Sequence, residues 1–273
     1  MSIAKRRGVL IAALVLLSGL AAAAATADEI LDRMEAEADR LADGSMVATL
    51  SFETTYSYGS PSTYTLGMLS KPDYSLIYFI EPQLDAGTMY LFVDEETDAG
   101  KNTRFWIYLP GLGVVKELVT EEELSGGFAG SSLSLSDFSG EDARTDYDVS
   151  LVSEEDLAIG EDTRAAYVLE LIAKDGVDSD TPRSLMWIDT ESYVMLRMEA
   201  YNDLGHLDTM LEVVELADFE GMITYAEMRT TDVLEESATV IVVLERHRPE
   251  GKIADEVFLP EALTSFDPVE WGF

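Results

Sequence analysis

From residue 46 onward, the chain consists of short segments in which apolar side chains recur at every second position. In the first segment Met46, Ala48, Leu50 and Phe52 are apolar and alternate with mostly polar residues. Successive side chains of a β-strand point to opposite faces, so this alternation is typical of strands. Tight turns such as Tyr58-Gly59-Ser60-Pro61 separate the segments. Consecutive strands joined by such turns form an antiparallel meander.

The pattern therefore predicts a mainly β protein with a few helices. In the segment near residue 196, Leu196 and Met198 point one way while Arg197 and Glu199 point the other, so part of the sheet has one dry and one wet face. The candidate strands are residues 46–57, 62–70, 74–81, 88–94, 104–109, 113–119, 145–153, 165–173, 184–189, 193–201, 207–216, 223–232 and 238–247.

An amphipathic helix is predicted ahead of the first strand. Asp28 is a suitable N-cap, because its side chain can accept a hydrogen bond from the first turn. The apolar residues that follow have helical spacing, which gives the helix one face to pack on the sheet. They are Ile30, Leu31, Met34, Ala38 and Leu41.

The first residues have the pattern of an export signal. Lys5, Arg6 and Arg7 precede an apolar run over residues 9–20, and Ala25-Thr26-Ala27 offers small residues at a cleavage site. We expect residues 1–27 to be removed near Ala27, which leaves residues 28–273 as a single periplasmic domain. The chain has no cysteine, so we expect neither a lipid anchor nor disulfides. No later stretch reaches the roughly 18 apolar residues of a membrane-spanning helix, so stable membrane insertion is not expected.

The chain is strongly acidic. Its 53 acidic residues against 18 basic ones give a formal net charge of −35. Nucleic acid and anionic membranes would repel such a protein, so no nucleic-acid partner is expected. Two interpretations of the charge remain: a solvated coat suited to high salt, and a face that attracts a basic partner.

The stretch "FWIYLPGLGVVKEL" at residues 105–118 is unusually apolar for this chain. In a strand Phe105, Ile107 and Leu109 would face one side, and Trp106 and Tyr108 the other. Both sides are apolar, so this strand requires apolar cover on both of its faces.

Between residues 120 and 142 the strand pattern stops. Thr120 and Glu123 have the spacing of a capping box that begins a short helix. The Gly/Ser-rich stretch that follows carries Phe128, Leu133, Leu135 and Phe138. Glycines 126, 127 and 130 give it conformational freedom, so we interpret it as a movable lid over the sheet. The alternative is a surface loop that tucks a few side chains over a sheet edge.

No constellation for catalysis or metal binding is present in the sequence. There is no cysteine, no G-x-S-x-G element and no H-E-x-x-H element, and the only histidines are His206 and His247. The acidic stretches 94–98 and 175–180 do not fit the spacing of an EF-hand calcium loop. We therefore expect no enzyme activity, no catalytic residues, no metal and no cofactor.

The C-terminal "VEWGF" suggests a remote alternative, an outer-membrane β-barrel. Val269, Trp271 and Phe273 alternate as in a barrel's closing strand, but Pro268 would break that strand. The outward positions of the other candidate strands are also rich in acids, which a lipid-facing wall excludes.

Three elements together give the chain a family resemblance. They are W-x-Y-L-P-x-L-G at residues 106–113, D-F-S-x-E-D at 137–142, and W-x-D with L-R-x-E-x-Y within 187–201. With the order of helix, meander and Gly/Ser-rich segment, they resemble the outer-membrane lipoprotein-sorting proteins, the LolA-like periplasmic carriers. The resemblance implies a half-open, incomplete antiparallel β-barrel covered by an α-helical lid. It also implies a monomer, with an inner-membrane exporter and an outer-membrane acceptor as partners.

In this interpretation the protein binds acyl chains of lipoproteins or other lipids in an apolar cavity. The alternative is an envelope sensor or scaffold that uses the same fold to bind another protein. The residues expected to form the cavity and its lid are Leu31, Met34, Tyr90, Phe92, Trp106, Tyr108, Phe128, Leu133, Leu135 and Phe138.

Lys71 is the candidate for a lid latch. Lys71-Pro72 stands where the well-known lipoprotein carrier has an Arg-Pro step whose arginine bonds to the lid helices. Lysine lacks the planar, bidentate donor fork of arginine, and Ser75 stands near the position of an aromatic residue needed for loading. The resemblance therefore implies a carrier of apolar ligands more directly than a dedicated lipoprotein shuttle.

Overall fold

The computed structural model describes residues 25–97, 100–125, 127–138, 143–177, 179 and 181–273. The expected export signal at 1–27 lies almost wholly outside these residues. The expected lid lies inside them except for Gly126 and residues 139–142.

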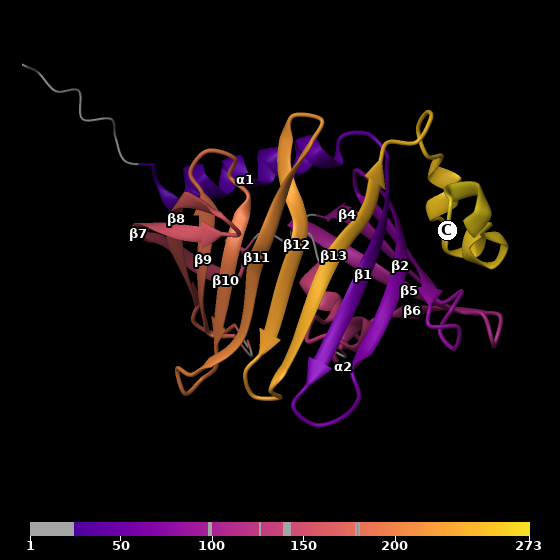
Figure 1. Cartoon of the computed structure of the whole chain (residues 1–273), viewed down its shortest axis with the longest axis horizontal. Coiled ribbons are helices and arrows are strands. Elements are labelled where there is room, and N and C mark those ends of the chain that lie inside the picture. Colours follow the sequence, from indigo (N-terminus) through magenta and orange to yellow (C-terminus); the bar gives the residue numbers. More distant parts are fainter. Residues whose placement is uncertain (1–24, 98–99, 126, 139–142, 178, 180) are drawn as a thin grey trace, which may run out of the picture.

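A single antiparallel sheet contains the strands of the described chain. They are β1 (Met46–Tyr56), β2 (Ser62–Lys71), β3 (Tyr74–Glu81), β4 (Met89–Thr97), β5 (Gly100–Leu109), β6 (Val114–Leu118), β7 (Tyr147–Ile159), β8 (Asp162–Ala173), β9 (Arg183–Asp189), β10 (Met195–Tyr201), β11 (Leu207–Phe219), β12 (Met222–Asp232) and β13 (Ser237–His247). Their order is β6-β5-β4-β3-β2-β1-β13-β12-β11-β10-β9-β8-β7. The sheet curves but stays open, with β6 and β7 as its two edges (Figure 1). The prediction of an incomplete antiparallel barrel is confirmed.

The β7–β8 hairpin is longer than the sequence predicted. Its strands continue through residues 154–164, where Ala158 pairs with Thr163 close to the turn at Gly160. Glu154, Glu155 and Asp156 are all exposed here. The polar run Ser153-Glu154-Glu155-Asp156 interrupts the alternation, so the sequence did not predict that the strand continues to Leu157 and Ile159, which pack in a cluster with Val213.

Helix α1 (Ala27–Ala42) precedes the sheet, as predicted, but Thr26 caps it instead of Asp28. The Thr26 hydroxyl accepts from the backbone N–H of Glu29 at 3.2 Å, and the Glu29 carboxylate accepts from the Thr26 N–H at 2.9 Å. This reciprocal pair is a capping box, which places Asp28 in the first turn. Ile30 and Leu31 of the helix are buried against the sheet.

The sheet has two apolar faces in its β1–β5 half, and a different segment covers each. One face, the lid face, carries Phe52, Leu66, Phe79, Phe92 and Phe105, which pack against residues 124–138. On the opposite face, residues of β1–β5 pack against the C-terminal segment, residues 252–273. That segment holds η3 (Asp255–Phe258), η4 (Pro260–Ser265) and η5 (Pro268–Trp271), so "VEWGF" forms a 3₁₀ turn and not a strand.

Helix α1 lies on the lid face too, over the other half of the sheet. One row of facing residues runs across this side of the sheet through Thr54, Thr239, Thr230, Leu211, Met198, Met186 and Leu169. Phe52, two residues before Thr54, contacts the lid, whereas Leu169 and Met186 pack with α1. In Figure 1, α1 runs behind β10–β12 and the C-terminal segment lies at the far right.

None of the helices in the described part of the chain combines the length and the apolar character needed to cross a membrane.

Candidate functional site

The lid segment, residues 120–138, places an aromatic side chain at the centre of the lid face. It contains α2 (Glu121–Leu124), η1 (Phe128–Gly130) and η2 (Leu135–Phe138). Phe128 is only 2% exposed. Its ring centroid lies 6.0 Å from that of Phe52, 5.7 Å from Phe79, 5.4 Å from Tyr90 and 5.2 Å from Phe138. These contacts are edge-to-face, the favourable geometry for aromatic pairs.

Polar contacts join the described part of this segment to β1 and β12. The Tyr56 hydroxyl donates to the backbone carbonyl of Gly130 at 2.7 Å, and the hydroxyls of Ser132 and Thr230 lie 2.9 Å apart. Within the segment, the Phe128 N–H donates to the Leu133 carbonyl at 2.6 Å. The segment is also attached by the apolar burial of Phe128, Leu135 and Phe138, which is the kind of contact that an apolar ligand can replace.

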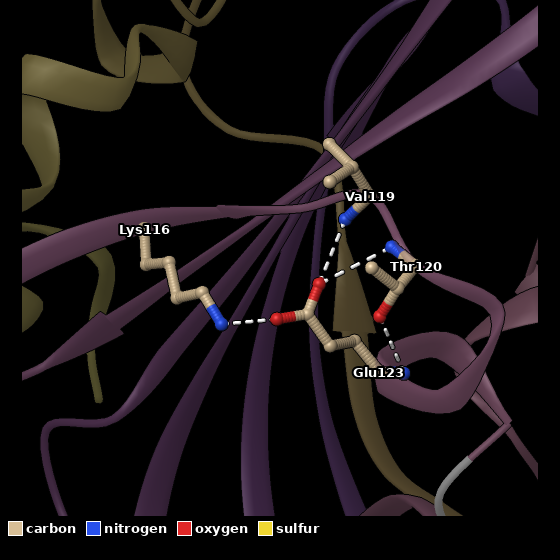
Figure 2. A network of polar contacts seen from close by, with 4 residues as sticks. All are labelled: Lys116, Val119, Thr120 and Glu123. Carbon is tan, nitrogen blue, oxygen red and sulfur yellow. Dashed lines mark hydrogen bonds and ion pairs between the residues drawn. The ribbon is translucent and has the colours of Figure 1, made fainter.

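The start of the lid segment is fastened by Glu123, as Figure 2 shows. Its carboxylate accepts from Lys116 Nζ and from the backbone N–H groups of Val119 and Thr120, at 3.0 and 3.2 Å. The Thr120 hydroxyl accepts from the Glu123 N–H at 3.3 Å, which confirms the predicted capping box. The bond from Lys116, followed by those from the two N–H groups, lowers the pKa of Glu123 to about 2. This network ties the lid to the edge strand β6.

A small hollow remains between the lid and the sheet. Its volume is about 130 Å³, and its lining includes Phe52, Ile77, Phe92 and Phe138, with Ser75 also at its wall. A cavity of about 150 Å³ admits a benzene-sized molecule. An acyl chain is longer than that, so the lid side chains would have to leave the sheet before a whole chain could lie there.

The two helical residues expected at the cavity occupy a separate cluster. Leu31 is 1% exposed, and it packs with Met34 against β8–β10 near Leu169 and Ile188. Of the expected set, Tyr90, Phe92, Phe128, Leu133, Leu135 and Phe138 do come together on the lid face. The lid-face cover thus has two parts, the lid segment over β1–β5 and α1 over β8–β10.

Trp106 and Tyr108 lie on the opposite face, away from the lid. Both pack with the C-terminal segment, and the Arg104 guanidinium lies 4.6 Å from the Trp106 ring centre. Phe105 points to the lid face. The predicted requirement for apolar cover on both faces of this strand is confirmed, but Trp106 and Tyr108 do not line the lid-face hollow, contrary to our expectation.

A family model described as "Uncharacterized protein" matches residues 71–265, well over half of the chain. The chain belongs to this family. The search of curated proteins gave no match.

Solved structures share the fold across most of this chain. A DUF1329 family protein from Desulfovibrio piger is 24% identical with a TM-score of 0.74, covering 87% of this chain and 98% of its own. A putative outer membrane lipoprotein-sorting protein domain from Vibrio parahaemolyticus is 22% identical with a TM-score of 0.72, covering 87% and 99%. A LolA superfamily protein from Nitrosomonas europaea is 20% identical with a TM-score of 0.64, covering 86% and 98%. These similarities confirm the expected LolA-like fold.

Lys71, the expected lid latch, contacts the C-terminal segment. Its ammonium group donates to the Asp255 carboxylate and, at 3.4 Å, to the Ile253 carbonyl. It also lies 5.0 Å from the ring centre of Phe258. Lys71 is at the end of β2, and its side chain lies on the face opposite the lid. It therefore holds the C-terminal segment, and not the lid as we expected.

The C-terminal cover was not predicted from the sequence. Ile253, Phe258 and Leu263 are almost fully buried on the face opposite the lid. Phe273 lies over Gly67, where an added Cβ would come within 2.6 Å of the Phe273 ring. A glycine in the interior of an apolar strand often marks close packing, so Gly67 was the signal that could have revealed this cover.

No group of histidine and carboxylate side chains suited to a metal ion occurs among the described residues. The acidic stretches 94–98 and 175–180 fall partly outside them.

Proposed function

We propose that the protein is an exported periplasmic carrier, which binds acyl chains of lipoproteins or other lipids against the lid face and catalyses no reaction. The observation that carries this proposal is the way in which the lid face is filled. Phe128, Leu135 and Phe138 come from an irregular segment, yet they occupy the centre of the apolar face and leave a hollow beside it. An acyl chain would take the place of these side chains.

The free energy gained by closing the lid is comparable to that gained by burying an acyl chain in its place, which a carrier requires. Each buried aromatic or leucine side chain stabilises the closed lid by roughly 1.5 to 3 kcal/mol, so three of them contribute about 5 to 9 kcal/mol. A chain of about twelve methylenes gains about 10 kcal/mol on burial, at about 0.8 kcal/mol each. A ligand of this size would offset the loss of the lid contacts without binding irreversibly.

The rest of the proposal follows from the sequence. The protein would be cut near Ala27, fold as one domain over residues 28–273, and act as a monomer. It would accept its lipid from an inner-membrane exporter and pass it to an outer-membrane acceptor. Its similarity to a lipoprotein-sorting protein domain supports this role at the level of the fold.

The test is direct measurement of lipid binding. Native mass spectrometry of the protein purified without detergent should show a bound lipid mass, and the delipidated protein should bind a fluorescent fatty acid saturably. Phe138→Ala enlarges the hollow and should change the affinity, whereas Val152→Ala, at an exposed site, should not.

A protein with no lipid mass and no saturable probe binding would overturn the proposal. If it instead retained a protein partner that high salt releases, the sensor or scaffold function would be supported, because salt screens charge but not apolar burial.

A further inference from the structure

Three neighbouring hairpin turns expose large apolar side chains at the same end of the strands, and the β12–β13 turn exposes two, Val233 and Leu234. These turns join β1 to β2, β10 to β11 and β12 to β13, and they form the lower edge of the sheet in Figure 1. Tyr58 is 91% exposed, Leu204 79% and Leu234 65%. We refer to these three residues as the apolar tips.

The turns at the opposite edge have a different character. Glu220 lies in the β11–β12 turn, Glu191 in the β9–β10 turn and Asp73 in the β2–β3 turn, and all three are exposed. In the described part of these turns no large apolar side chain is exposed. The turns at both ends of the strands carry exposed acidic residues, but only the three turns at the lower end in Figure 1 present the apolar tips.

The fold itself gives no reason for the apolar tips. A side chain that is 79% exposed buries little area, so Leu204 contributes little to folding. The local turn chemistry is supplied by its neighbours, because the Asn202 side chain accepts from the backbone N–H groups of Leu204 and His206, each at 3.1 Å. A polar residue at position 204 would preserve that turn.

The apolar tips flank the place where the lid segment is held. Tyr56, two residues before Tyr58, donates to Gly130 of the lid. Thr230, four residues before Leu234, contacts Ser132 of the lid. A partner that docks on these turns would therefore lie close to the lid segment.

We infer that the apolar tips dip into the surface of a lipid bilayer with zwitterionic headgroups and bring the lid next to the acyl chains. The purpose of this docking rests on the proposed function, although the docking itself does not. Leucine side chains are suited to the acyl boundary of a bilayer, and a tyrosine to its headgroup level.

The geometry favours a bilayer over a protein partner. The tips stand on three separate hairpins, and the exposed acids Asp203, Glu235 and Glu236 are their neighbours in the sequence. A protein partner would need three separate pockets that match the tips, whereas a fluid lipid bilayer can accept separate side chains without matching their shape. The net charge of −35 would repel anionic lipids, which selects zwitterionic ones.

Vesicle flotation tests this inference with the full-length mature protein. One variant carries Tyr58→Ser, Leu204→Ser and Leu234→Ser. The matched control carries Val152→Ser, Leu244→Ser and Val269→Ser, at sites that are 50%, 57% and 77% exposed but belong to none of the three turns. Circular dichroism and thermal unfolding establish that both variants are folded.

The wild type and the control should float with phosphatidylcholine–phosphatidylethanolamine vesicles, and less with phosphatidylglycerol vesicles. The tip variant should lose about tenfold in partitioning, which corresponds to about 1.4 kcal/mol. In Tyr58→Trp, the new indole should be quenched by brominated acyl chains, whereas the indole of Leu244→Trp should not.

Failure of the wild type to float, or equal flotation of the tip variant, would overturn the inference. Tip-dependent capture of a protein without vesicle binding would overturn it in favour of a protein partner. The soluble fatty-acid probe separates this result from the proposed function, because the tip variant should bind that probe as tightly as the wild type.

Discussion

At the scale of single residues, Glu123 shows how one carboxylate can hold the start of the lid. Its lowered pKa means that the ionised form is stabilised by Lys116 and by two backbone N–H groups. This contribution to stability is fully present above the ordinary glutamate pKa of 4.5, and it is lost as the pH falls from there towards about 2.

The first prediction is therefore a titration of Glu123. Its side-chain carboxyl resonance in NMR should titrate near pH 2. Lys116→Ala should move that midpoint up towards 4.5, because the largest cause of the shift is removed. Lys252→Ala, at an exposed position in the C-terminal segment, is the control and should leave the midpoint unchanged. A wild-type midpoint near 4.5 would show that the network of Figure 2 does not form in solution.

Phe128 provides the second prediction at this scale. Phe128→Asp places a charge among Phe52, Phe79 and Tyr90, where no partner for it is present in the described surroundings. We expect the lid segment to leave the sheet and lipid retention to fall, while the strands stay folded. Hydrogen exchange should show loss of protection at residues 120–138 and unchanged protection at 184–216.

Trp106→Ala is the matched control for Phe128→Asp. Trp106 is buried against the C-terminal segment, so its truncation should lower the melting temperature but leave affinity for a fatty-acid probe unchanged. If Trp106→Ala lowered affinity as much as Phe128→Asp did, the apolar ligand would be bound on the opposite face.

At the scale of elements, the C-terminal segment depends on a close approach to β2. The Phe273 ring lies over Gly67 and stacks on Tyr78, with ring centroids 6.2 Å apart. We predict that Gly67→Ala displaces the ring and costs about 1 to 3 kcal/mol in the free energy of unfolding. Hydrogen exchange should report weaker protection of residues 252–273, with the lid segment unaffected.

A double-mutant cycle identifies the cause of that loss. Once Phe273→Ala has removed the ring, adding Gly67→Ala should cost little more, because the clash is gone. Additive losses would mean that Gly67 is needed for the strand backbone and not for the approach of Phe273.

The elements that sequence could predict are those with a clear period. Alternation located the strands, and helical spacing located α1, because a half-buried element shows its dry face directly in the sequence. The strand at 104–109 was predicted to need cover on two sides, and both covers exist. The end of the β7–β8 hairpin was not predicted, because the polar run at residues 153–156 separates Leu157 and the buried Ile159 from the alternation before it.

Other features depend on contacts between residues that are far apart in the chain. The pairing of β1 with β13 and the burial of Phe258 leave no periodic signal in the sequence. The side of the sheet to which Trp106 points could be predicted relative to Phe105, but the segment covering that side could not. Six of the expected residues meet on the lid face, whereas Trp106 and Tyr108 lie on the opposite face, and their role in binding a ligand stays a prediction.

At the scale of the whole molecule, like-charge repulsion is the main electrostatic effect. The chain has 53 acidic and 18 basic residues, so negative charges outnumber positive ones by 35 and repel one another. Local ion pairs such as Arg144 with Asp32 and Glu35 stabilise individual contacts, at 2.5 and 2.7 Å. Salt weakens both the attraction within ion pairs and the repulsion between like charges, and at a net charge of −35 we expect the relief of repulsion to be the larger effect.

We therefore predict that the melting temperature rises with ionic strength. Between about 0.01 and 1 M salt the Debye length falls from about 30 to 3 Å, and relief of repulsion worth about 2 kcal/mol would raise the melting temperature by roughly 4 to 8 °C. Thermal unfolding in sodium chloride and in potassium chloride measures this, and equal curves identify screening instead of specific ion binding. Glu154→Gln with Asp156→Asn, two exposed changes on β7, should raise stability at low salt and flatten the curve. A melting temperature that fell with salt would show that the ion pairs outweigh the repulsion.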